Sequence, residues 1–406
     1  MIEMPLHVTV LGYRVGGIEH QSMHFTGLLL FSLIAVFWIV QGVRVGRGAL
    51  RLPHLKDQAP CQVEHCPSIS LIFAARNEQD KLPRALATLA KIDYPALEII
   101  AVNDRSSDET LAILGQESGR NRRLKIVNVE TLPNQWLGKP HALQAGYEES
   151  QGEWLLFTDA DVCFKPDSLR KAIGMARSRN LDHLTLMGDV EMHGFWEKTV
   201  LTFFALGFYI GTNPAAVSNP NSRAYLGVGA FQLVRRKPYQ TSGMHRRLAM
   251  EVVDDLKLGK ILKSAGFRSG VGLAGEYVTV RWHAGIRNIV RGVTKNFFAV
   301  AGYRTEMVAL QLVGIFCTNV LPFVILPFVH GWTLTLAVVS AVIALAAQAG
   351  TARVMKASRI YALTQPLGAA IFSYMLLRST VITLKQGGVI WRDTFYPLDQ
   401  LRRGLV

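Results

Sequence analysis

Two carboxylates one residue apart, Asp159 and Asp161, form the most informative pair of side chains in this sequence. They lie in the segment Thr158–Asp161, directly after the apolar run Trp154–Phe157, which is typical of a buried strand. Carboxylates at the end of a buried strand are costly to desolvate unless they bind a cation, and their hard oxygens suit Mg²⁺ or Mn²⁺. The pair therefore predicts a divalent metal site that could hold a diphosphate, although the same triplet alone also occurs in solvated turns.

Polar side chains also follow two earlier apolar runs. Asn77 and Glu78 come shortly after the run 68–74, and Asp104 comes shortly after the run 97–102. Open parallel sheets bind their ligands at the carboxyl ends of their strands. We therefore expect Asn77, Asp104 and Asp159 to meet in one crevice.

Strands and helices alternate over the part of the chain that contains these residues. Strands are predicted over residues 68–74, 97–102, 124–129 and 153–158, and helices from Leu82 to Tyr94, from Asp108 onward and over 139–150. This alternation is typical of βαβ units and predicts an α/β fold with a parallel sheet. After Pro166 the pattern is less regular, and the aromatic-rich stretch 195–210 is expected to lie at a membrane interface or to pack on the sheet.

Long apolar stretches flank this part of the chain. The chain has 406 residues, half of them hydrophobic, and its mean hydropathy is positive. Uncharged stretches long enough to cross a bilayer cover residues 25–43, 307–329 and 332–350, and a fourth, 361–384, is interrupted by Gln365, Pro366 and Arg378. The first stretch lacks the basic residues and the cleavage pattern of a signal peptide. The sequence thus predicts an integral membrane protein.

Basic residues flank two of these stretches: Arg44, Arg47, Arg51 and Lys56 follow the first, and Arg353, Lys356 and Arg359 follow the third. Loops rich in lysine and arginine stay on the cytoplasmic side of a membrane. Both assignments place the large middle part of the chain in the cytoplasm, because the second and third stretches form a hairpin.

The net charge of +14 is compatible with nucleic acid or with anionic lipid headgroups as a partner. No nucleic-acid-binding motif is present, so attraction to anionic headgroups is the simpler explanation, and no nucleic-acid partner is expected. A basic amphipathic helix is predicted over residues 286–305, because apolar residues follow helical spacing while Arg287, Arg291 and Lys295 share another face. A helix on the surface of a soluble domain is the alternative.

Four cysteines are present, at Cys61, Cys66, Cys163 and Cys317. Their spacing does not provide the two matched pairs of a structural zinc site. In a cytoplasmic setting we expect free thiols at all four positions.

Six short motifs stand in the chain in a fixed order: SLIFAARNE at 70–78, VNDRSSD at 102–108, WLGKPHAL at 136–143, FTDAD at 157–161, GVGAF at 227–231 and VDDL at 253–256. This series resembles the family 2 glycosyltransferases over most of residues 67–305. The resemblance implies the type A glycosyltransferase fold, a Rossmann-like nucleotide-sugar-binding domain. The arrangement of membrane stretches resembles the branch that glycosylates lipids, which includes ceramide glucosyltransferase-like, hopanoid-associated and carotenoid-associated enzymes.

The resemblance assigns donor-binding roles to five residues. Asp104 would bind the uracil or ribose of a nucleotide-sugar, because a carboxylate accepts hydrogen bonds from the base or the ribose hydroxyls. Lys139 would lie near the diphosphate. The backbone at Ala75, with Asn77 and Glu78, would border the nucleoside, although Glu78 could equally be a first-turn acid favoured by the helix dipole.

The same resemblance assigns the acidic residues to metal binding and catalysis. Asp159 and Asp161 would bind Mn²⁺ or Mg²⁺ and the sugar diphosphate, with Asp161 as the stronger expectation for direct coordination. Asp255 would be the general base that takes the proton of the acceptor hydroxyl. Its neighbour Asp254 would raise the pKa of the pair if both are buried. An acidic pair at a helix N-terminus is the alternative for these two.

Two features depart from the family pattern. Asn103 stands where the family often has a second aspartate, so this position supplies no charge. The later Gln/Arg-x-x-Arg-Trp motif is not clearly present. Arg281–Trp282 matches its end, but Val278 stands where the motif begins with glutamine or arginine. The segment 291–296 could do the same work by binding diphosphate or by closing the acceptor side.

The predicted layout is an N-terminal tail at 1–24, a transmembrane helix at 25–43, a basic linker at 44–66, a cytoplasmic glycosyltransferase domain at 67–285, an interfacial helix at 286–305, membrane segments at 307–384 and a C-terminal tail at 385–406. The predicted function is metal-dependent inverting transfer of a hexose-type sugar from a UDP-sugar to a lipid acceptor at a bacterial inner membrane. A processive polysaccharide synthase, a non-catalytic nucleotide-sugar-binding module and a sugar nucleotidyltransferase are the alternatives.

Overall fold

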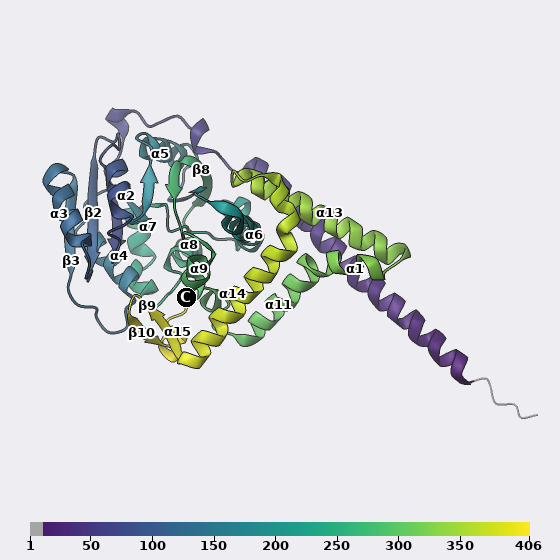
Figure 1. Ribbon diagram of the computed structural model, residues 1–406. Coiled ribbons are helices and arrows are strands. Elements are labelled where there is room, and N and C mark those ends of the chain that lie inside the picture. The colour runs from purple at the N-terminus through teal and green to yellow at the C-terminus, as the bar shows by residue number, and fades with distance from the viewer. Residues whose placement is uncertain (1–10) are drawn as a thin grey trace, which may run out of the picture.

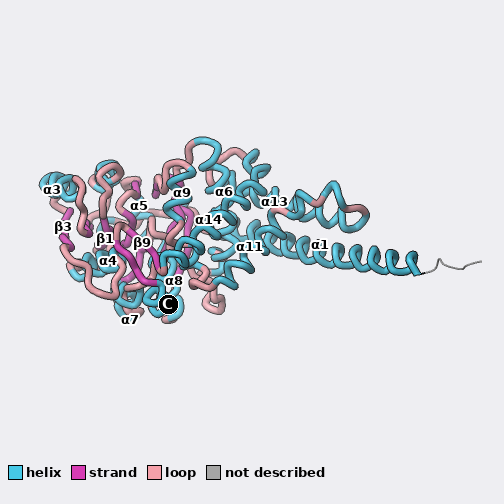
Figure 2. Tube along the Cα trace, turned by 60° about the horizontal axis from the view of Figure 1, so that its bottom comes forward, coloured by secondary structure: helices cyan, strands magenta, loops and turns pink. Residues whose placement is uncertain are grey.

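The computed structural model describes the backbone of residues 11–406 and the side chains from Phe25 onward. A mixed α/β domain and a group of long helices lie side by side (Figure 1, Figure 2). Residues 1–10 of the predicted tail at 1–24 lie outside the described residues. From Leu11 onward, the backbone belongs to helix α1 (Leu11–Arg51). The predicted membrane helix at 25–43 is thus the middle of a longer helix.

The domain is built on one sheet of eight strands in the order β3-β2-β1-β4-β7-β6-β8-β5. The strands are β1 (Ile69–Ala75), β2 (Leu97–Asp104), β3 (Leu124–Val129), β4 (Trp154–Asp159), β5 (Val162–Phe164), β6 (His183–Val190), β7 (Gln232–Arg235) and β8 (Ser269–Val280). The first four are parallel and lie where they were predicted. Both β5 and β7 pair antiparallel with their neighbours, so the sheet is mixed rather than parallel throughout.

Helices cover both faces of this sheet: α2 (Leu82–Leu89), α3 (Thr110–Arg120), α4 (Gly138–Glu148), α5 (Ser168–Ser178), α7 (Arg236–Thr241) and α8 (Asp254–Ser264). Successive side chains of a strand point to opposite faces. Accordingly, Leu71 and Phe73 of β1 belong to the core formed with α2 and α5, whereas Ile72 belongs to the core formed with α4 and α8. Burial on both faces explains why the central strands are continuous apolar runs.

The long helices beside the domain are α1, α11 (Thr305–Asn319), α13 (Gly331–Val354) and α14 (Gln365–Gln386), and the short helix α12 (Leu321–Val324) lies between α11 and α13 in the chain. Four described segments are long and apolar enough to cross a membrane: Phe25–Arg51, Thr305–Val324, Gly331–Val354 and Arg359–Gln386. They coincide with the four apolar stretches of the sequence.

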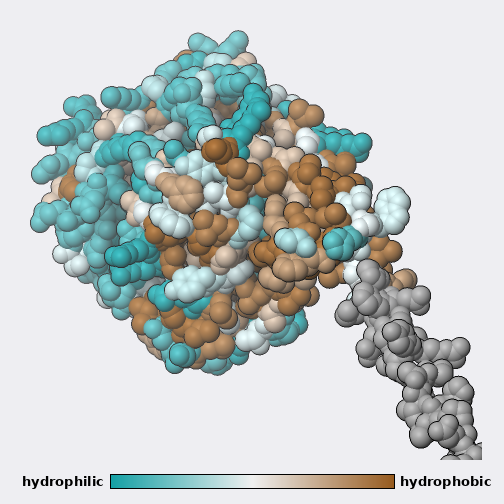
Figure 3. Space-filling view, turned by 45° about the vertical axis from the view of Figure 1, so that its right-hand side comes forward, coloured by the Kyte–Doolittle hydropathy of each residue, from teal (hydrophilic) through white to brown (hydrophobic). Residues whose placement is uncertain are grey.

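Apolar side chains on these helices face outward. Leu310, Val313 and Trp332 are 64%, 61% and 76% exposed, and Figure 3 shows apolar surface gathered over this side of the molecule. Exposed apolar areas of this kind mark a surface that contacts lipid or another apolar partner.

Helix α6 (Gly194–Thr212) joins the domain to the long helices. Gln348 of α13 is fully buried and donates from Nε2 to Oγ1 of Thr202 at 3.1 Å. Helix α14 approaches so closely that a Cβ on Gly368 would lie 2.7 Å from the Cβ of Phe203. The aromatic-rich stretch 195–210 therefore packs mainly against the other long helices.

The predicted interfacial helix at 286–305 is wrong as one continuous helix. Residues in this range form α9 (Ile286–Val293) and α10 (Phe297–Val300), separated by a turn. Arg287 and Arg291 are exposed, whereas Lys295 lies in the turn and is only partly exposed. In this turn the ammonium of Lys295 lies over the ring of Trp391, so Lys295 does not share the exposed basic face of the two arginines.

The predicted C-terminal tail at 385–406 is also structured. It forms a hairpin of β9 (Gly388–Trp391) and β10 (Thr394–Pro397), followed by α15 (Leu398–Arg403). Figure 1 shows this yellow segment against the α/β domain, at the end of α14. A segment that follows the last apolar helix thus returns to the domain.

The prediction of four free thiols is wrong for two of them. Cys61 and Cys66 form a disulfide in the linker between α1 and β1, while Cys163 and Cys317 are free. This linker is held against α5, since the backbone N–H of Cys61 donates to the carbonyl oxygen of Arg170 at 3.0 Å. The spacing of the two cysteines gave no reason to distinguish a pair of thiols from a bridge.

A buried ion pair fixes α6 to the end of β8. Glu197 is 4% exposed and accepts two hydrogen bonds from the guanidinium of Arg281, at 2.6 and 2.8 Å, and one from the N–H of Gly285 at 2.6 Å. These contacts lower the pKa of Glu197 from 4.5 to about 2, and the hydrogen bonds from Arg281 make the largest contribution. A depressed pKa contributes stability that is present above pH 4.5 and is lost as the pH falls toward 2.

We expect Glu197→Gln to lower the free energy of unfolding by about 3 kcal/mol at pH 7, with the difference from wild type shrinking toward pH 2. Chemical unfolding in detergent at pH 7 and pH 3 measures both values. Glu306→Gln is the control, because the Glu306 carboxylate pairs with Arg304 but is 61% exposed and should contribute little. An equal effect of both variants would contradict the assignment.

Candidate functional site

The carboxyl ends of three parallel strands lie side by side and bring the predicted polar residues to one edge of the sheet. Ala75 of β1 pairs with Asn103 of β2, and Ala74 pairs with Asp159 of β4. Asp104 and Asp159 therefore flank the end of β1. The parallel pairing of these strands gives the crevice that their order in the sequence predicts.

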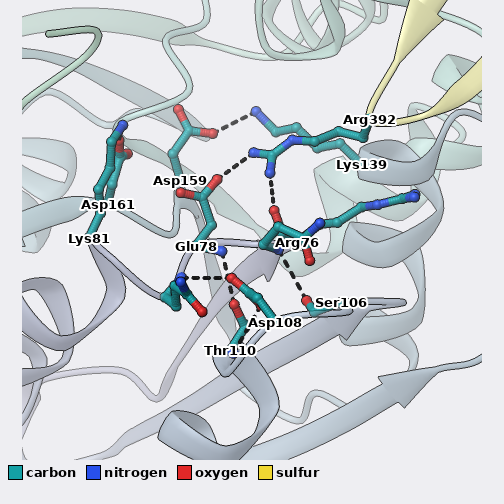
Figure 4. A network of polar contacts seen from close by, with 12 residues as sticks. Arg76, Glu78, Lys81, Ser106, Asp108, Thr110, Lys139, Asp159, Asp161 and Arg392 are labelled. Atoms are coloured by element: carbon teal, nitrogen blue, oxygen red, sulfur yellow. Dashed lines mark hydrogen bonds and ion pairs between the residues drawn. The ribbon is translucent and has the colours of Figure 1, made fainter.

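Asp159 and Asp161 each contact a lysine. The Nζ of Lys139, on the first turn of α4, donates to Oδ1 of Asp159 at 2.6 Å. The Nζ of Lys81, just before α2, donates to Oδ2 of Asp161 at 2.7 Å, and Figure 4 shows the two pairs close together. Lys81 was not identified from the sequence, because its contact joins residues 80 positions apart.

Asp255 lies close to this acidic pair. Its Oδ2 accepts a hydrogen bond from the N–H of Gly229 at 3.0 Å. A Cβ on Gly229 would lie 2.5 Å from Oδ2 of Asp159 and 3.1 Å from Oδ2 of Asp255. The two carboxylates thus converge on one glycine, and any side chain there would fill the space between them.

Asp254 is more deeply buried than its neighbour. It is 3% exposed, and its Oδ2 lies 4.0 Å from the Nζ of Lys139. Burial raises the pKa of Asp254 to about 7, with Lys139 opposing and Asp255 and Asp159 adding to the rise. Burial alone would lower the pKa of Lys139, but the surrounding carboxylates raise it. Lys139 is therefore a cation between two acidic groups.

Asp104 ends β2 and is 3% exposed. Its two carboxylate oxygens accept hydrogen bonds from Arg105, from Nε at 2.7 Å and Nη2 at 3.1 Å. A Cβ on Gly138 would lie 2.6 Å from Oδ2 of Asp104. The glycine at the start of α4 thus allows that helix to approach the Asp104 carboxylate.

A small pocket of about 60 Å³ adjoins Asp104, and three of its lining residues come from the C-terminal hairpin: Trp391, Arg392 and Tyr396. Arg392 donates to the carbonyl oxygen of Arg76 and to the carboxylate of Glu78, as Figure 4 shows. The backbone at Ala75 borders the same pocket. The hairpin was missed from the sequence, in which residues 385–406 carry no motif of the series.

Asn77 and Glu78 contact other protein groups. Oδ1 of Asn77 accepts from the N–H of Ser107 at 2.9 Å, so this amide fixes the loop after β2. Glu78 pairs with Arg392. Asp108 accepts from the N–H of Thr110 at 3.0 Å and so lies directly before α3, whose N-cap position is Glu109.

Arg281 does not point into the crevice, because it pairs with Glu197. The ammonium of Lys295 instead lies 4.0 Å from the ring centroid of Trp391, which lines the pocket that adjoins Asp104. Burial and Lys139 lower the pKa of Lys295 to about 8, while Asp254, Asp255 and Asp159 oppose this fall. The departure of the sequence from the Arg-Trp motif is therefore accompanied by a lysine from the turn between α9 and α10.

Among the described residues, no three histidine, cysteine, aspartate or glutamate side chains are close enough to form a metal site. Two carboxylates, Asp159 and Asp161, do lie together at the end of β4, and each pairs with a lysine ammonium where a metal ion could bind. Proteins usually bind Mg²⁺ through one or two carboxylates, and substrate phosphates and water supply its other ligands. The residues present therefore fit a divalent ion that arrives with a diphosphate.

Comparison with known proteins agrees with this geometry. The model of the family "Glycosyl transferase family 2" matches residues 70–243. The chain is 26% identical over 255 residues to the 4,4'-diaponeurosporenoate glycosyltransferase of Staphylococcus haemolyticus, covering 62% of this chain and 66% of that protein. It is 32% identical over 152 residues to a poly-β-1,6-N-acetyl-D-glucosamine synthase of Staphylococcus epidermidis, covering 36% of this chain and 35% of that protein.

A solved structure shares the fold. The mannosyltransferase PcManGT of Pyrobaculum calidifontis, solved with GDP-Man and Mn²⁺, superposes with a TM-score of 0.53 at 17% identity, over 89% of this chain and 99% of that one. The predicted type A fold is thereby confirmed. The family match over β1 to α7 identifies residues 70–243 as a domain of glycosyl transferase family 2, and the prediction of a glycosyltransferase is confirmed.

Proposed function

We propose that this protein transfers one sugar from a UDP-sugar to a lipid in the membrane, with inversion at the anomeric carbon. The observation that carries the proposal is the convergence of Asp159 and Asp255 on Gly229, beside helices apolar enough to span a membrane. A donor phosphate site and a general base thus share one crevice next to lipid. The membrane is proposed to be a bacterial inner membrane, with the domain on its cytoplasmic side.

The donor would bind along the strand ends. Asp104, the backbone at Ala75 and the hairpin residue Tyr396 border the pocket proposed for the nucleoside. Arg105 would release part of its hold on Asp104 so that the carboxylate can accept from the donor. Lys139 would neutralise charge on the diphosphate, and Asp159 and Asp161 would hold a divalent ion that serves as a Lewis acid there.

The transfer step needs a base on the acceptor side. Asp255 would take the proton of the acceptor hydroxyl while its oxygen attacks the anomeric carbon. The bond from that carbon to the diphosphate oxygen breaks, and its electron pair leaves with the nucleoside diphosphate. The N–H of Gly229 orients the Asp255 carboxylate toward Asp159. Single displacement inverts the configuration of the sugar.

A lipid acceptor is favoured by the helices and by one relative. The relative with the longest match cited above carries the name of a carotenoid glycosyltransferase, and the four apolar segments belong to the group of helices beside the domain. A polysaccharide synthase is the second candidate, because a relative with a shorter match is named as one. Product size separates the two: one added sugar, or a long polymer.

Release of nucleoside diphosphate tests the reaction class. Purified full-length protein is incubated with Mn²⁺ or Mg²⁺, a panel of UDP- and GDP-sugars, and total bacterial lipid. We expect UDP to be released only when lipid is present. Release of pyrophosphate would indicate a nucleotidyltransferase, and release of no nucleotide with any donor would indicate a binding module; either result would contradict the proposal.

The acidity of Asp254 predicts a pH dependence. Its pKa of about 7 means that it is protonated below pH 7 and loses its attraction to Lys139 there. We expect kcat/KM of wild type to fall below pH 7. Asp254→Asn should remain at the low-pH level, about 10- to 100-fold below the wild-type maximum, with no change across pH 6–8.

The same variant gives an independent readout of stability. A carboxyl whose pKa is raised by folding binds its proton more tightly in the folded state, so its contribution to stability falls as the pH rises from 3.8 through 7. Asp254→Asn should therefore raise the unfolding temperature at pH 8 more than at pH 4. A variant that keeps the wild-type pH profile and stability would contradict this role for Asp254.

A further inference from the structure

Lys295 is a partly exposed cation in the acidic crevice without a carboxylate partner. Its Nζ donates to Oδ1 of Asn296 at 2.7 Å and lies 4.0 Å from the ring centroid of Trp391. Among the described residues, no aspartate or glutamate oxygen lies within 4.0 Å of it. The amide and the ring compensate the charge of this ammonium less fully than a carboxylate would.

The neighbouring lysine differs in this respect. Lys139 is hydrogen-bonded to Asp159 at 2.6 Å and lies 4.0 Å from Asp254, so its charge is already compensated. Lys295 faces the same carboxylates from a greater distance and is repelled by Lys139. A cation without a carboxylate partner is stabilised by an anion that enters the crevice.

Two elements that lie far from Lys295 in the sequence hold it in place. Ser379 of α14 is fully buried; its Oγ donates to the carbonyl oxygen of Thr294 at 2.5 Å and accepts from the N–H of Phe298 at 3.0 Å. These bonds fix both ends of the turn that carries Lys295. Trp391 of the C-terminal hairpin covers the ammonium from the other side.

We propose that Lys295 is a second cation, beside Lys139, that binds the diphosphate leaving group, and that Ser379 positions it from the membrane helix α14. The inference rests on the proposed function and adds a residue and a support to it. When the bond between the anomeric carbon and the diphosphate oxygen breaks, the electron pair stays on that oxygen. The protonated amine would donate a hydrogen bond to it, while the proton of the acceptor goes to Asp255.

Variants of Lys295 in the full-length protein test its role. We expect Lys295→Gln to lower kcat about 100-fold or more, and to weaken UDP binding in the presence of Mn²⁺ at least 10-fold by calorimetry. Lys295→Arg should recover at least a tenth of the wild-type kcat, because it keeps the charge. Lys91→Gln, at an exposed lysine, is the control and should change neither value.

A merely structural role gives a different pattern. If Lys295→Gln lowers the unfolding temperature but leaves UDP affinity and kcat within threefold of wild type, the inference is wrong. It is also wrong if Lys295→Arg is no better than Lys295→Gln. Wild type that transfers no sugar would instead overturn the proposed function itself, so the two failures are distinguishable.

Ser379→Ala tests the support from the membrane helix. The variant should lower kcat about 10-fold in the wild-type background and have no further effect in the Lys295→Gln background, because a positioning residue acts only through the group it positions. Ser340→Ala is the matched control: Ser340 is also fully buried in a long apolar helix, but it donates within its own helix, to Leu336 at 2.7 Å. Equal loss in both Lys295 backgrounds would overturn the positioning role.

Discussion

Replacing Asp255 by asparagine should reduce kcat about 1,000-fold, which lies within the range for loss of a general base. The amide has nearly the same shape, and its one oxygen can still accept from the N–H of Gly229, although the N–H of Leu256 then loses the acceptor that it has at 2.8 Å. The amide cannot take the proton of an acceptor hydroxyl. We therefore expect donor KM and the unfolding temperature to stay close to those of wild type.

The control for this variant is Asp93→Asn, which changes an aspartate whose side chain is 60% exposed and pairs with Arg170 away from the crevice. It should leave kcat unchanged. If Asp255→Asn retains more than a tenth of the wild-type kcat, Asp255 is not the base. Loss of folding in Asp255→Asn, seen as a lower unfolding temperature, would also remove the evidence for a chemical role.

Replacing Asp161 by asparagine should abolish the response of the enzyme to metal. Chelation of divalent ions should inactivate wild type, and Mn²⁺ or Mg²⁺ should restore it. In Asp161→Asn the carboxylate that pairs with Lys81 becomes a neutral amide, so the ion loses one of its two proposed ligands. We expect kcat about 100- to 1,000-fold lower, at metal concentrations that saturate wild type, because a Lewis acid supplies several kcal/mol of stabilisation.

Titration of activity with Mn²⁺ measures this effect. Asp189→Asn is the matched control, because the Asp189 carboxylate also pairs with a lysine, Lys356, at 2.5 Å. A wild-type titration curve for Asp161→Asn would show that this residue is not a ligand. Full activity of wild type after chelation would contradict metal dependence as a whole.

The strands and the crevice were accessible from the sequence because their signals are local. Apolar runs of strand length end directly at Asp104 and Asp159, and parallel pairing then brings strand ends together whatever lies between them. Asp255 was predicted from the last motif of the series, VDDL at 253–256, which lies at the start of α8. What could be predicted was therefore the part of the site set by strand ends and helix starts.

The rest of the site depends on contacts between distant segments. Arg392 reaches the carbonyl oxygen of Arg76 across 316 positions of the chain, and no periodicity reports such a contact. Lys295 was assigned to a continuous amphipathic helix because its spacing from Arg287 and Arg291 is helical. In the structure the turn held by Ser379 interrupts that helix, and the ammonium of Lys295 lies over the ring of Trp391.

The mass of the lipid product tests the central claim most directly. Full-length wild type in liposomes of total bacterial lipid, supplied with UDP-sugars and Mn²⁺, is compared with Asp255→Asn by mass spectrometry of the extracted lipids. The predicted result is one lipid class that gains the mass of a single sugar residue, in wild type only. Polymer retained by the enzyme, or UDP release with no lipid that gains mass, would contradict transfer of one sugar to a membrane lipid.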